Sequence, residues 1–165
     1  MSHHEHKARA PKSARVAVIT CSDTRTKEND TGGGAIVAGL QAGGHVVAGY
    51  EIVKDEPALI LAAIERAAGA QAVLITGGTG ITRRDSTFEA VSGVIARPLP
   101  GFGELFRMLS YGEIGSAAML SRATAGVTGD GRLLFAMPGS PAGVKLAMEK
   151  LVLPELGHLL EELAR

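Results

Sequence analysis

Three short apolar segments each end directly in glycine or small polar residues, and this shared ending limits the folds open to the chain. They are Val16–Thr20, Ala72–Thr76 and Leu133–Met137. Short, β-branched, unbroken apolar runs are typical of strands buried on both faces. A helical pattern follows each run, so we predict parallel strands in an α/β fold. Their carboxyl ends would share one edge of the sheet, where open α/β folds bind ligands.

The middle segment leads into a compact glycine loop, Gly77–Gly80, which is followed by Arg83, Arg84 and Asp85. Glycines let backbone N–H groups approach an anion closely, and the charged residues place anion and metal chemistry within reach. A Walker A loop would need a lysine after its last glycine, and a dinucleotide fingerprint would run directly into a helix. Neither pattern is present, so we predict a loop of another kind that can accommodate a phosphate group.

Composition excludes several classes of function. The formal net charge is zero, and the chain has two Tyr, four Phe and no Trp, which argues against a nucleic-acid partner. A single cysteine among 165 residues excludes an internal disulfide framework and fits a reducing compartment. No apolar stretch of about 18 residues is present, so we expect a soluble cytoplasmic protein with no membrane partner.

The chain divides into a flexible arm over residues 1–13 and a single domain over residues 14–165. The arm is polar and carries three histidines beside a glutamate: His3, His4, His6 and Glu5. These residues lack the spacing of a helical zinc site, so we interpret them as part of a tail.

Caps and periodicity predict the elements of the first half. A helix begins at Asp30 or Thr31 and ends at Gly43-Gly44, and a strand follows over His45–Val53. Pro57 opens the next helix. Ser86 and Glu89 form a capping-box pattern, which predicts a helix from Thr87 to about Ala96.

In the second half, proline and glycine separate shorter elements. Helical pieces are expected over Glu104–Met108 and Ile114–Leu120. An Asp-Gly turn between Ala123–Val127 and Leu133–Ala136 predicts a hairpin, so the sheet is mixed. Ser140 caps a helix that starts at Pro141, and a last amphipathic helix restarts at Pro154.

Four motifs in order carry a family resemblance: Thr76–Gly80, Arg84–Ala90, Pro100–Glu104 and Pro138–Pro141. Together with Ile19–Asp23 and Leu153–His158, they resemble the MoaB/MogA family of molybdenum cofactor biosynthesis proteins over roughly Ala14 to Leu163. Residues 100–118 and 153–163, and the early carboxyl end, are more similar to the MoaB type.

The resemblance implies a three-layer α/β/α molybdopterin-binding domain with a mostly parallel mixed sheet, assembled as a homo-trimer or a dimer of trimers. It implies Mg²⁺-dependent adenylylation, in which molybdopterin takes AMP from ATP. The adenylylated product would pass to a molybdate-insertion protein. The alternative is a non-catalytic molybdopterin-binding carrier or an assembly protein of the same pathway.

The resemblance also implies roles for particular residues. Asp55 and Asp85 would be the catalytic carboxylates and would hold Mg²⁺. The substrate-binding residues would be Ser22, Thr76, Gly77, Gly78, Thr79, Gly80, Arg84, Pro138, Gly139 and Ser140.

Several of these residues also have a structural interpretation. Asp55 could cap the helix that starts at Pro57, Asp85 could shape the turn before Ser86, and Arg83 and Arg84 could be solvated surface charges. Cys21 could be only a small buried residue. The chain departs from the family at Thr31-Gly32-Gly33, where many relatives have a serine before the glycine, and at Ser86, where a β-branched residue is common.

Overall fold

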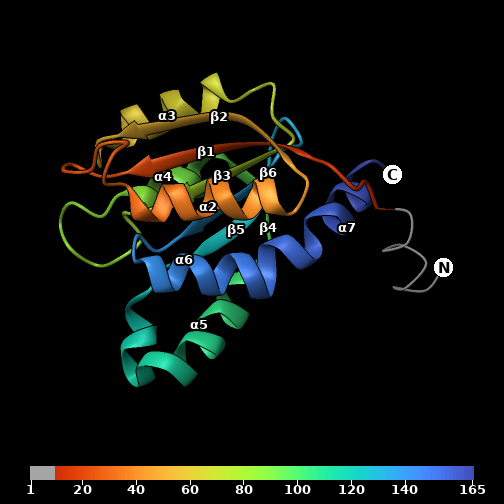
Figure 1. The fold of residues 1–165 in the computed structure, drawn as a ribbon. Coiled ribbons are helices and arrows are strands. Elements are labelled where there is room, and N and C mark those ends of the chain that lie inside the picture. Colours follow the sequence, from red (N-terminus) through yellow and green to blue (C-terminus); the bar gives the residue numbers. More distant parts are fainter. Residues whose placement is uncertain (1–9) are drawn as a thin grey trace.

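A six-stranded sheet forms the centre of the computed structural model, which describes residues 10–165 (Figure 1). The strand order is β2-β1-β3-β6-β5-β4. The strands are β1 (Arg15–Cys21), β2 (Val46–Val53), β3 (Ala72–Thr76), β4 (Ile95–Pro98), β5 (Thr124–Thr128) and β6 (Leu133–Met137).

The three predicted apolar strands are neighbours in the order β1-β3-β6, and they are parallel. Their register places Thr20 beside Thr76 and Thr76 beside Met137, so all three strands end at the same level. β2 is also parallel to β1, whereas β5 pairs antiparallel with both of its neighbours, β6 and β4. The predicted mixed, mostly parallel sheet is therefore confirmed.

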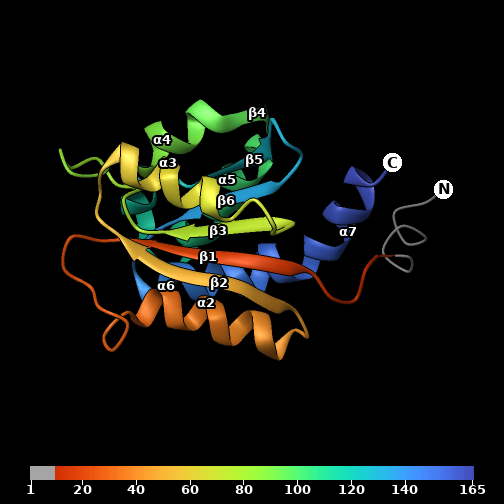
Figure 2. The same ribbon diagram turned by 90° about the horizontal axis from the view of Figure 1, so that it is seen from above.

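Helices cover both faces of the sheet and complete a three-layer α/β/α fold (Figure 2). α3 (Pro57–Arg66) and α4 (Thr87–Val94) lie on one face. The other face is covered by α2 (Thr31–Ala42), α6 (Pro141–Ala147), α5 (Pro100–Ile114), the 3₁₀ segment η1 (Gly115–Leu120), the π-helical turn η2 (Met148–Val152) and α7 (Leu153–Leu163).

Alternate side chains of the strands point into two separate cores, as the period of a strand requires. Leu74 belongs to the core beneath α2 and α6, whereas Val73 and Ile75 belong to the core beneath α3 and α4. All five residues of β3 are buried, which explains the unbroken apolar run in its sequence.

Two predicted helix caps are confirmed by their contacts. The Asp30 carboxylate accepts a hydrogen bond from the Gly33 N–H at 2.9 Å, and the Ser140 hydroxyl accepts one from the Gly143 N–H at 3.2 Å. Gly44, directly after the C-cap of α2, has φ +81°, the left-handed conformation that a side chain would oppose.

Two predicted elements differ from the structure. The helix expected to reach Ala96 ends at Val94, because Ile95–Pro98 form β4 and pair with β5. The helical piece expected over Glu104–Met108 is part of the longer α5. Pro100 occupies the first turn of α5, where its missing N–H costs nothing, and the helix continues from there through Tyr111-Gly112 to Ile114.

The capping box at Ser86 is also wrong, although α4 does begin where it predicted. The Ser86 side chain makes no capping hydrogen bond, and its Oγ is buried without a partner among the described residues. Glu89 forms an ion pair with Arg122 instead. The reciprocal bonds of a capping box are therefore absent.

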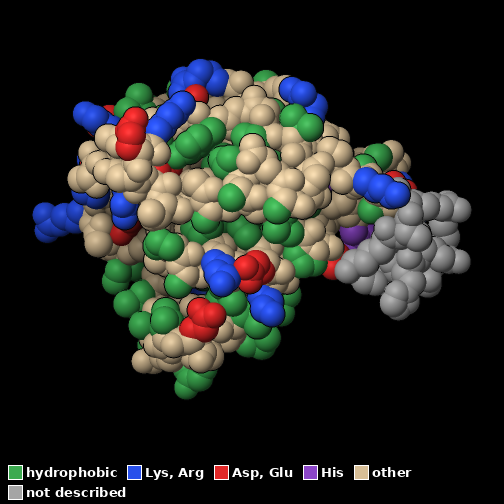
Figure 3. Space-filling view, viewed as in Figure 1, with side chains coloured by type: hydrophobic (Ala, Val, Ile, Leu, Met, Phe, Trp, Pro, Cys, Tyr) green, Lys and Arg blue, Asp and Glu red, His purple; other side chains and the backbone are tan. Residues whose placement is uncertain are grey.

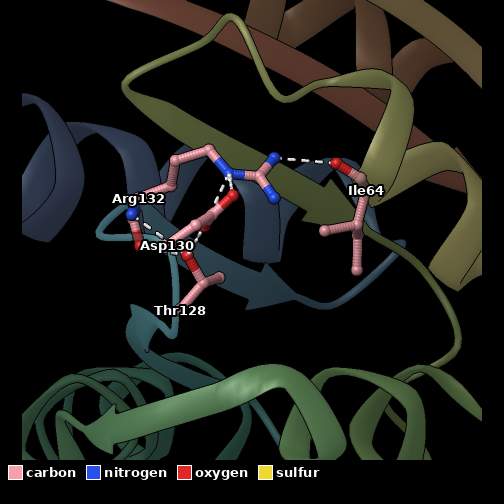
Figure 4. A network of polar contacts seen from close by, with 4 residues as sticks. All are labelled: Ile64, Thr128, Asp130 and Arg132. Atoms are coloured by element: carbon pink, nitrogen blue, oxygen red, sulfur yellow. Dashed lines mark hydrogen bonds and ion pairs between the residues drawn. The ribbon is translucent and has the colours of Figure 1, made fainter.

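The predicted hairpin between β5 and β6 lies at the edge of the sheet opposite the carboxyl ends of β1 and β3. There Arg132 donates to the backbone oxygen of Ile64 at 2.7 Å and to the Asp130 carboxylate at 3.0 Å (Figure 4). The Arg132 side chain is only 11% exposed. This contact ties the hairpin to the last turn of α3.

The amino-terminal histidines lie outside the described residues. Pro11 lies against α7, where its backbone oxygen would be 2.8 Å from a Cβ added at Gly157. Among residues 10–165, no helix has both the length and the hydropathy needed to cross a bilayer.

Candidate functional site

Loops from three strand ends meet at the carboxyl edge of the sheet. The Thr76 hydroxyl donates to the backbone oxygen of Pro138 at 2.8 Å, and the Gly77 N–H donates to the backbone oxygen of Met137 at 3.1 Å. A Cβ at Gly139 would lie 3.3 Å from the Cα of Gly77. The structure thus brings the loops after β3 and β6 into direct contact.

The first turn of α2 also packs against these loops at the carboxyl edge of the sheet. A Cβ at Gly32 would lie 3.2 Å from the backbone oxygen of Gly139 and 3.5 Å from the Thr76 hydroxyl. Gly32 therefore lies at the meeting point of the loops. A serine there would have to displace one of these neighbours by a few tenths of an ångström.

The backbone conformation of the glycine loop disfavours residues other than glycine. Gly77 and Gly78 have φ values of +93° and +67°. A Cβ at Gly77 would collide with the backbone oxygen of Cys21, and one at Gly78 would collide with the Thr87 hydroxyl and Asp55. The Thr87 hydroxyl donates to the Gly77 backbone oxygen at 2.8 Å and so fixes the loop. Both glycines are required by close approach as well as by conformation.

Three consecutive N–H groups of the loop are available to a ligand. Within residues 10–165, no hydrogen bond engages the backbone N–H of Gly78, Thr79 or Gly80. Successive free N–H groups in a tight loop form an anion-binding concavity. The loop therefore has the chemistry of a phosphate cradle.

Asp55 lies in the loop between β2 and α3, and one of its carboxylate oxygens is unusual. Oδ1 is buried, borders Gly78, and has no hydrogen-bond partner among the described residues. Burial, together with the nearby charges of Asp23 and Asp85, raises the pKa of the Asp55 carboxyl above its ordinary value. The residue before Pro57 is Glu56, and α3 has no side-chain cap, so Asp55 does not cap this helix.

Asp85 shapes the turn beyond the glycine loop. Its Oδ2 accepts hydrogen bonds from the N–H and the hydroxyl of Thr82 at 2.8 and 2.7 Å. A Cβ at Gly80 would lie 2.8 Å from the same oxygen. Asp85 therefore has a structural contact in this turn, and the same turn holds its carboxylate beside the glycine loop.

The donor set suits Mg²⁺ only if a ligand completes it. Among the described residues, no three His, Cys, Asp or Glu side chains are close enough together to hold a metal ion. Mg²⁺ is commonly bound by one or two carboxylates together with substrate phosphates. The orphan Oδ1 of Asp55 and the carboxylate of Asp85 fit that arrangement.

Arg84 forms an ion pair that the sequence did not reveal. Its Nε and Nη2 donate to the two carboxylate oxygens of Asp23 at 2.9 and 2.8 Å. Asp23 Oδ1 also accepts the Asp55 N–H at 3.2 Å. Asp23 follows β1 directly beside Ser22, so the rule that selected residues at strand ends could have selected it too.

Ser22 and Arg122 shape the backbone around the site. The Ser22 hydroxyl accepts the N–H groups of Thr24 and Arg25 at 3.2 and 3.1 Å. Arg122, which precedes β5, donates from Nε to the Gly80 backbone oxygen at 2.8 Å. No local sequence pattern identified Arg122, because its partners lie far away along the chain.

A buried network fixes the start of α2. Asp30 is 6% exposed and accepts hydrogen bonds from the hydroxyls of Thr20 (2.6 Å) and Tyr50. Burial and the neighbouring Asp30 raise the pKa of the Tyr50 phenol to about 12. The carboxylate therefore binds α2 to both β1 and β2.

Open hollows flank the converging loops. One has a volume of about 460 Å³ and is lined by Pro57, Ile81, Thr82, Arg83, Asp85, Ser86, Glu89 and Arg122. Another, of similar volume, is bordered by Ser22, Asp23, Arg25 and Lys54 among others. One hollow thus borders Asp85, and the other borders Asp23, the ion-pair partner of Arg84.

Comparison with known proteins places the chain in a family. Residues 17–158 match the profile described as "Probable molybdopterin binding domain". The chain is 52% identical to molybdenum cofactor biosynthesis protein B of Bacillus subtilis and 49% identical to that of Halalkalibacterium halodurans, covering 100% of this chain and 99% of each relative.

Solved structures agree with this assignment. A crystal structure of a molybdenum cofactor biosynthesis protein B superimposes with a TM-score of 0.90 at 51% identity, covering 95% of this chain and 99% of that one. The tungsten cofactor synthesizing protein MoaB from Pyrococcus furiosus gives a TM-score of 0.87 at 38% identity, covering 94% and 100%. The chain therefore belongs to the MoaB/MogA family of molybdenum cofactor biosynthesis proteins, and its high-identity relatives are of the MoaB type.

Proposed function

We propose that this protein binds molybdopterin and catalyses its Mg²⁺-ATP-dependent adenylylation. The observation that carries the proposal is the position of Asp55 Oδ1, a buried carboxylate oxygen without a partner that borders the free N–H groups of the glycine loop. Phosphates and a divalent cation are the groups that this combination of free donors and acceptor suits.

The chemistry asks mainly for positioning and charge neutralisation. An oxygen of the molybdopterin phosphate attacks the α-phosphorus of ATP, and the bond to the bridging oxygen breaks to release pyrophosphate. Backbone N–H groups of residues 78–80 orient one phosphate, and Asp55 and Asp85 carry the carboxylates beside it. Mg²⁺ bound there would neutralise charge on the phosphate oxygens.

Purified protein, incubated with molybdopterin and Mg²⁺-ATP labelled in the α-phosphate, tests the proposal. We expect labelled adenylylated molybdopterin from the parent protein and none from Asp85→Ala or Asp55→Asn. Asp130→Asn is a matched control, because it removes a carboxylate at the opposite edge of the sheet and should keep activity. Retention of the pterin without label transfer would instead identify a carrier protein.

We also propose that the protein assembles as a homo-trimer or a dimer of trimers and delivers its product to a molybdate-insertion protein. Six large hydrophobic side chains are exposed on α5 and η1: Leu105, Met108, Tyr111, Ile114, Met119 and Leu120. Hydrophobic side chains cover that end of the molecule (Figure 3). Exposed patches of this kind mark protein contacts. Light scattering should show an assembly that Met108→Glu weakens; a monomeric parent protein would contradict it.

A further inference from the structure

The guanidinium group of Arg84 is already hydrogen-bonded to a carboxylate of the protein itself, that of Asp23. Both of its hydrogen bonds go to Asp23, on the loop after β1, and no other partner engages its guanidinium among the described residues. The side chains are 57% and 35% exposed, so solvent and ligands can reach both. In this state the guanidinium group of Arg84 is hydrogen-bonded to Asp23, and among the described residues no hydrogen bond joins it to the glycine loop.

A phosphate can replace the Asp23 carboxylate on Arg84 with little geometric change. The planar guanidinium binds carboxylates and phosphates through the same two parallel hydrogen bonds. An ion pair exposed to water contributes little net stability, so exchange of one partner for another is inexpensive. Asp23 itself stays in place, because its Oδ1 also accepts the Asp55 N–H.

The surrounding charges make this exchange selective. Asp23, Asp55 and Asp85 interact electrostatically around Arg84, and Lys54 is a further cation that acts on Asp23. An entering anion meets these carboxylates and must also displace one of them from Arg84. A singly charged anion gains nothing over Asp23, whereas a phosphoryl group with two negative charges and three acceptor oxygens binds the arginine more strongly.

We propose that Asp23 is a specificity-determining residue that holds Arg84 until a doubly charged phosphoryl group displaces it. The inference rests on the proposed function, because it requires that a substrate phosphate meets Arg84 at this edge. It differs from that proposal in assigning Asp23 a role opposed to binding: Asp23 weakens the affinity of the site for anions and so sets which anions can enter.

Titration calorimetry with inorganic pyrophosphate, in buffer freed of divalent cations, tests this role. We expect Asp23→Asn to bind pyrophosphate about fivefold more tightly, the upper range for an exposed ion pair. Asparagine keeps an oxygen for the Asp55 N–H and removes the charge. Arg84→Gln should bind more weakly than the parent, and the gain from Asp23→Asn should vanish in the Asp23→Asn/Arg84→Gln double variant.

Glu56→Gln is the matched control. Glu56 is an exposed carboxylate that also interacts with Arg84 electrostatically but makes no hydrogen bond to it. Its substitution should raise the affinity less than about twofold, because only long-range repulsion is removed. A similar gain from Glu56→Gln, an unchanged or lower affinity in Asp23→Asn, or an equal gain without Arg84 would overturn the inference.

The outcome also separates this inference from the proposed function. An Arg84-dependent gain in Asp23→Asn, combined with no transfer of label to molybdopterin, would support the role of Asp23 and refute the transferase. Label transfer with no change in pyrophosphate affinity on substitution of Asp23 would do the reverse. Pyrophosphate binding by neither the parent nor Asp23→Asn would overturn the role of Asp23, while label transfer in the presence of Mg²⁺ would still decide the proposed function.

Discussion

Both edges of the sheet carry an arginine–aspartate pair, and the two pairs differ in what else the arginine touches. At the carboxyl edge, the Arg84 side chain is 57% exposed and bonds only to Asp23. At the opposite edge, Arg132 is 11% exposed and also donates to the Ile64 backbone oxygen. The exposed guanidinium group of Arg84, which has one exchangeable partner, is available to a ligand. The buried guanidinium group of Arg132, which donates to a backbone oxygen, stabilises the fold.

The largest effect is expected at the backbone that supports the exposed pair. Gly78→Ala places a Cβ against the Thr87 hydroxyl and Asp55 at a φ of +67°. We expect the free energy of unfolding to fall by about 2 kcal/mol or more and the transferase activity to be lost. Urea denaturation and the label-transfer assay measure the two losses. Gly129→Ala, where an added Cβ meets nothing within 4 Å, is the control.

Substitution of each arginine with methionine should affect the two pairs differently. Arg132→Met removes the buried charged hydrogen bond to the Ile64 oxygen and the ion pair to Asp130, so the free energy of unfolding should fall by about 2 kcal/mol. Arg84→Met should leave stability close to that of the parent and weaken the binding of pyrophosphate. Urea denaturation of both variants is the measurement. Equal losses of stability would show that burial does not distinguish the two pairs.

Much of the carboxyl edge follows from the sequence, whereas the contacts that hold its loops together do not. Unbroken apolar runs identify β1, β3 and β6, and the glycines mark the loop, because both features are local. β4 was missed, because pairing with β5 outweighs the helical pattern that runs into Ile95.

The bracing contacts join residues far apart in the chain. Arg84 and Asp23 are 61 residues apart, Arg122 and Gly80 are 42, and Arg132 and Ile64 are 68. A single sequence shows that such arginines exist but not which partners they meet. Sequence therefore predicts which loops form the edge, and only the fold shows which of their charges are already engaged.

A smaller effect is expected at Asp55, where function and stability should oppose one another. The raised pKa means that folding favours the protonated carboxyl, so its ionisation destabilises the fold as the pH rises above the ordinary aspartate range. Asp55→Asn should therefore be more stable than the parent at pH 7.5, by less than about 1 kcal/mol after allowance for solvent screening, and equally stable at pH 3.

Urea denaturation at both pH values measures this difference, and the label-transfer assay measures the accompanying loss of activity. A variant that is less stable than the parent at pH 7.5 would show that the carboxylate of Asp55 supports the fold. In that case Asp55 would resemble the residues around Arg132 rather than those of a ligand site.

The smallest effect is expected at Cys21, which sharpens the comparison within the carboxyl edge itself. Cys21 ends β1 directly before Ser22 and Asp23, yet it is 3% exposed, and burial raises the pKa of its thiol to about 12. A thiol-reactive disulfide reagent at pH 8 should leave it unmodified in the folded protein and react rapidly in urea. Rapid reaction in the folded protein would mean that the edge opens beyond the exposed loops. Protection would place the boundary between ligand-accessible and core residues at the single peptide bond between Cys21 and Ser22.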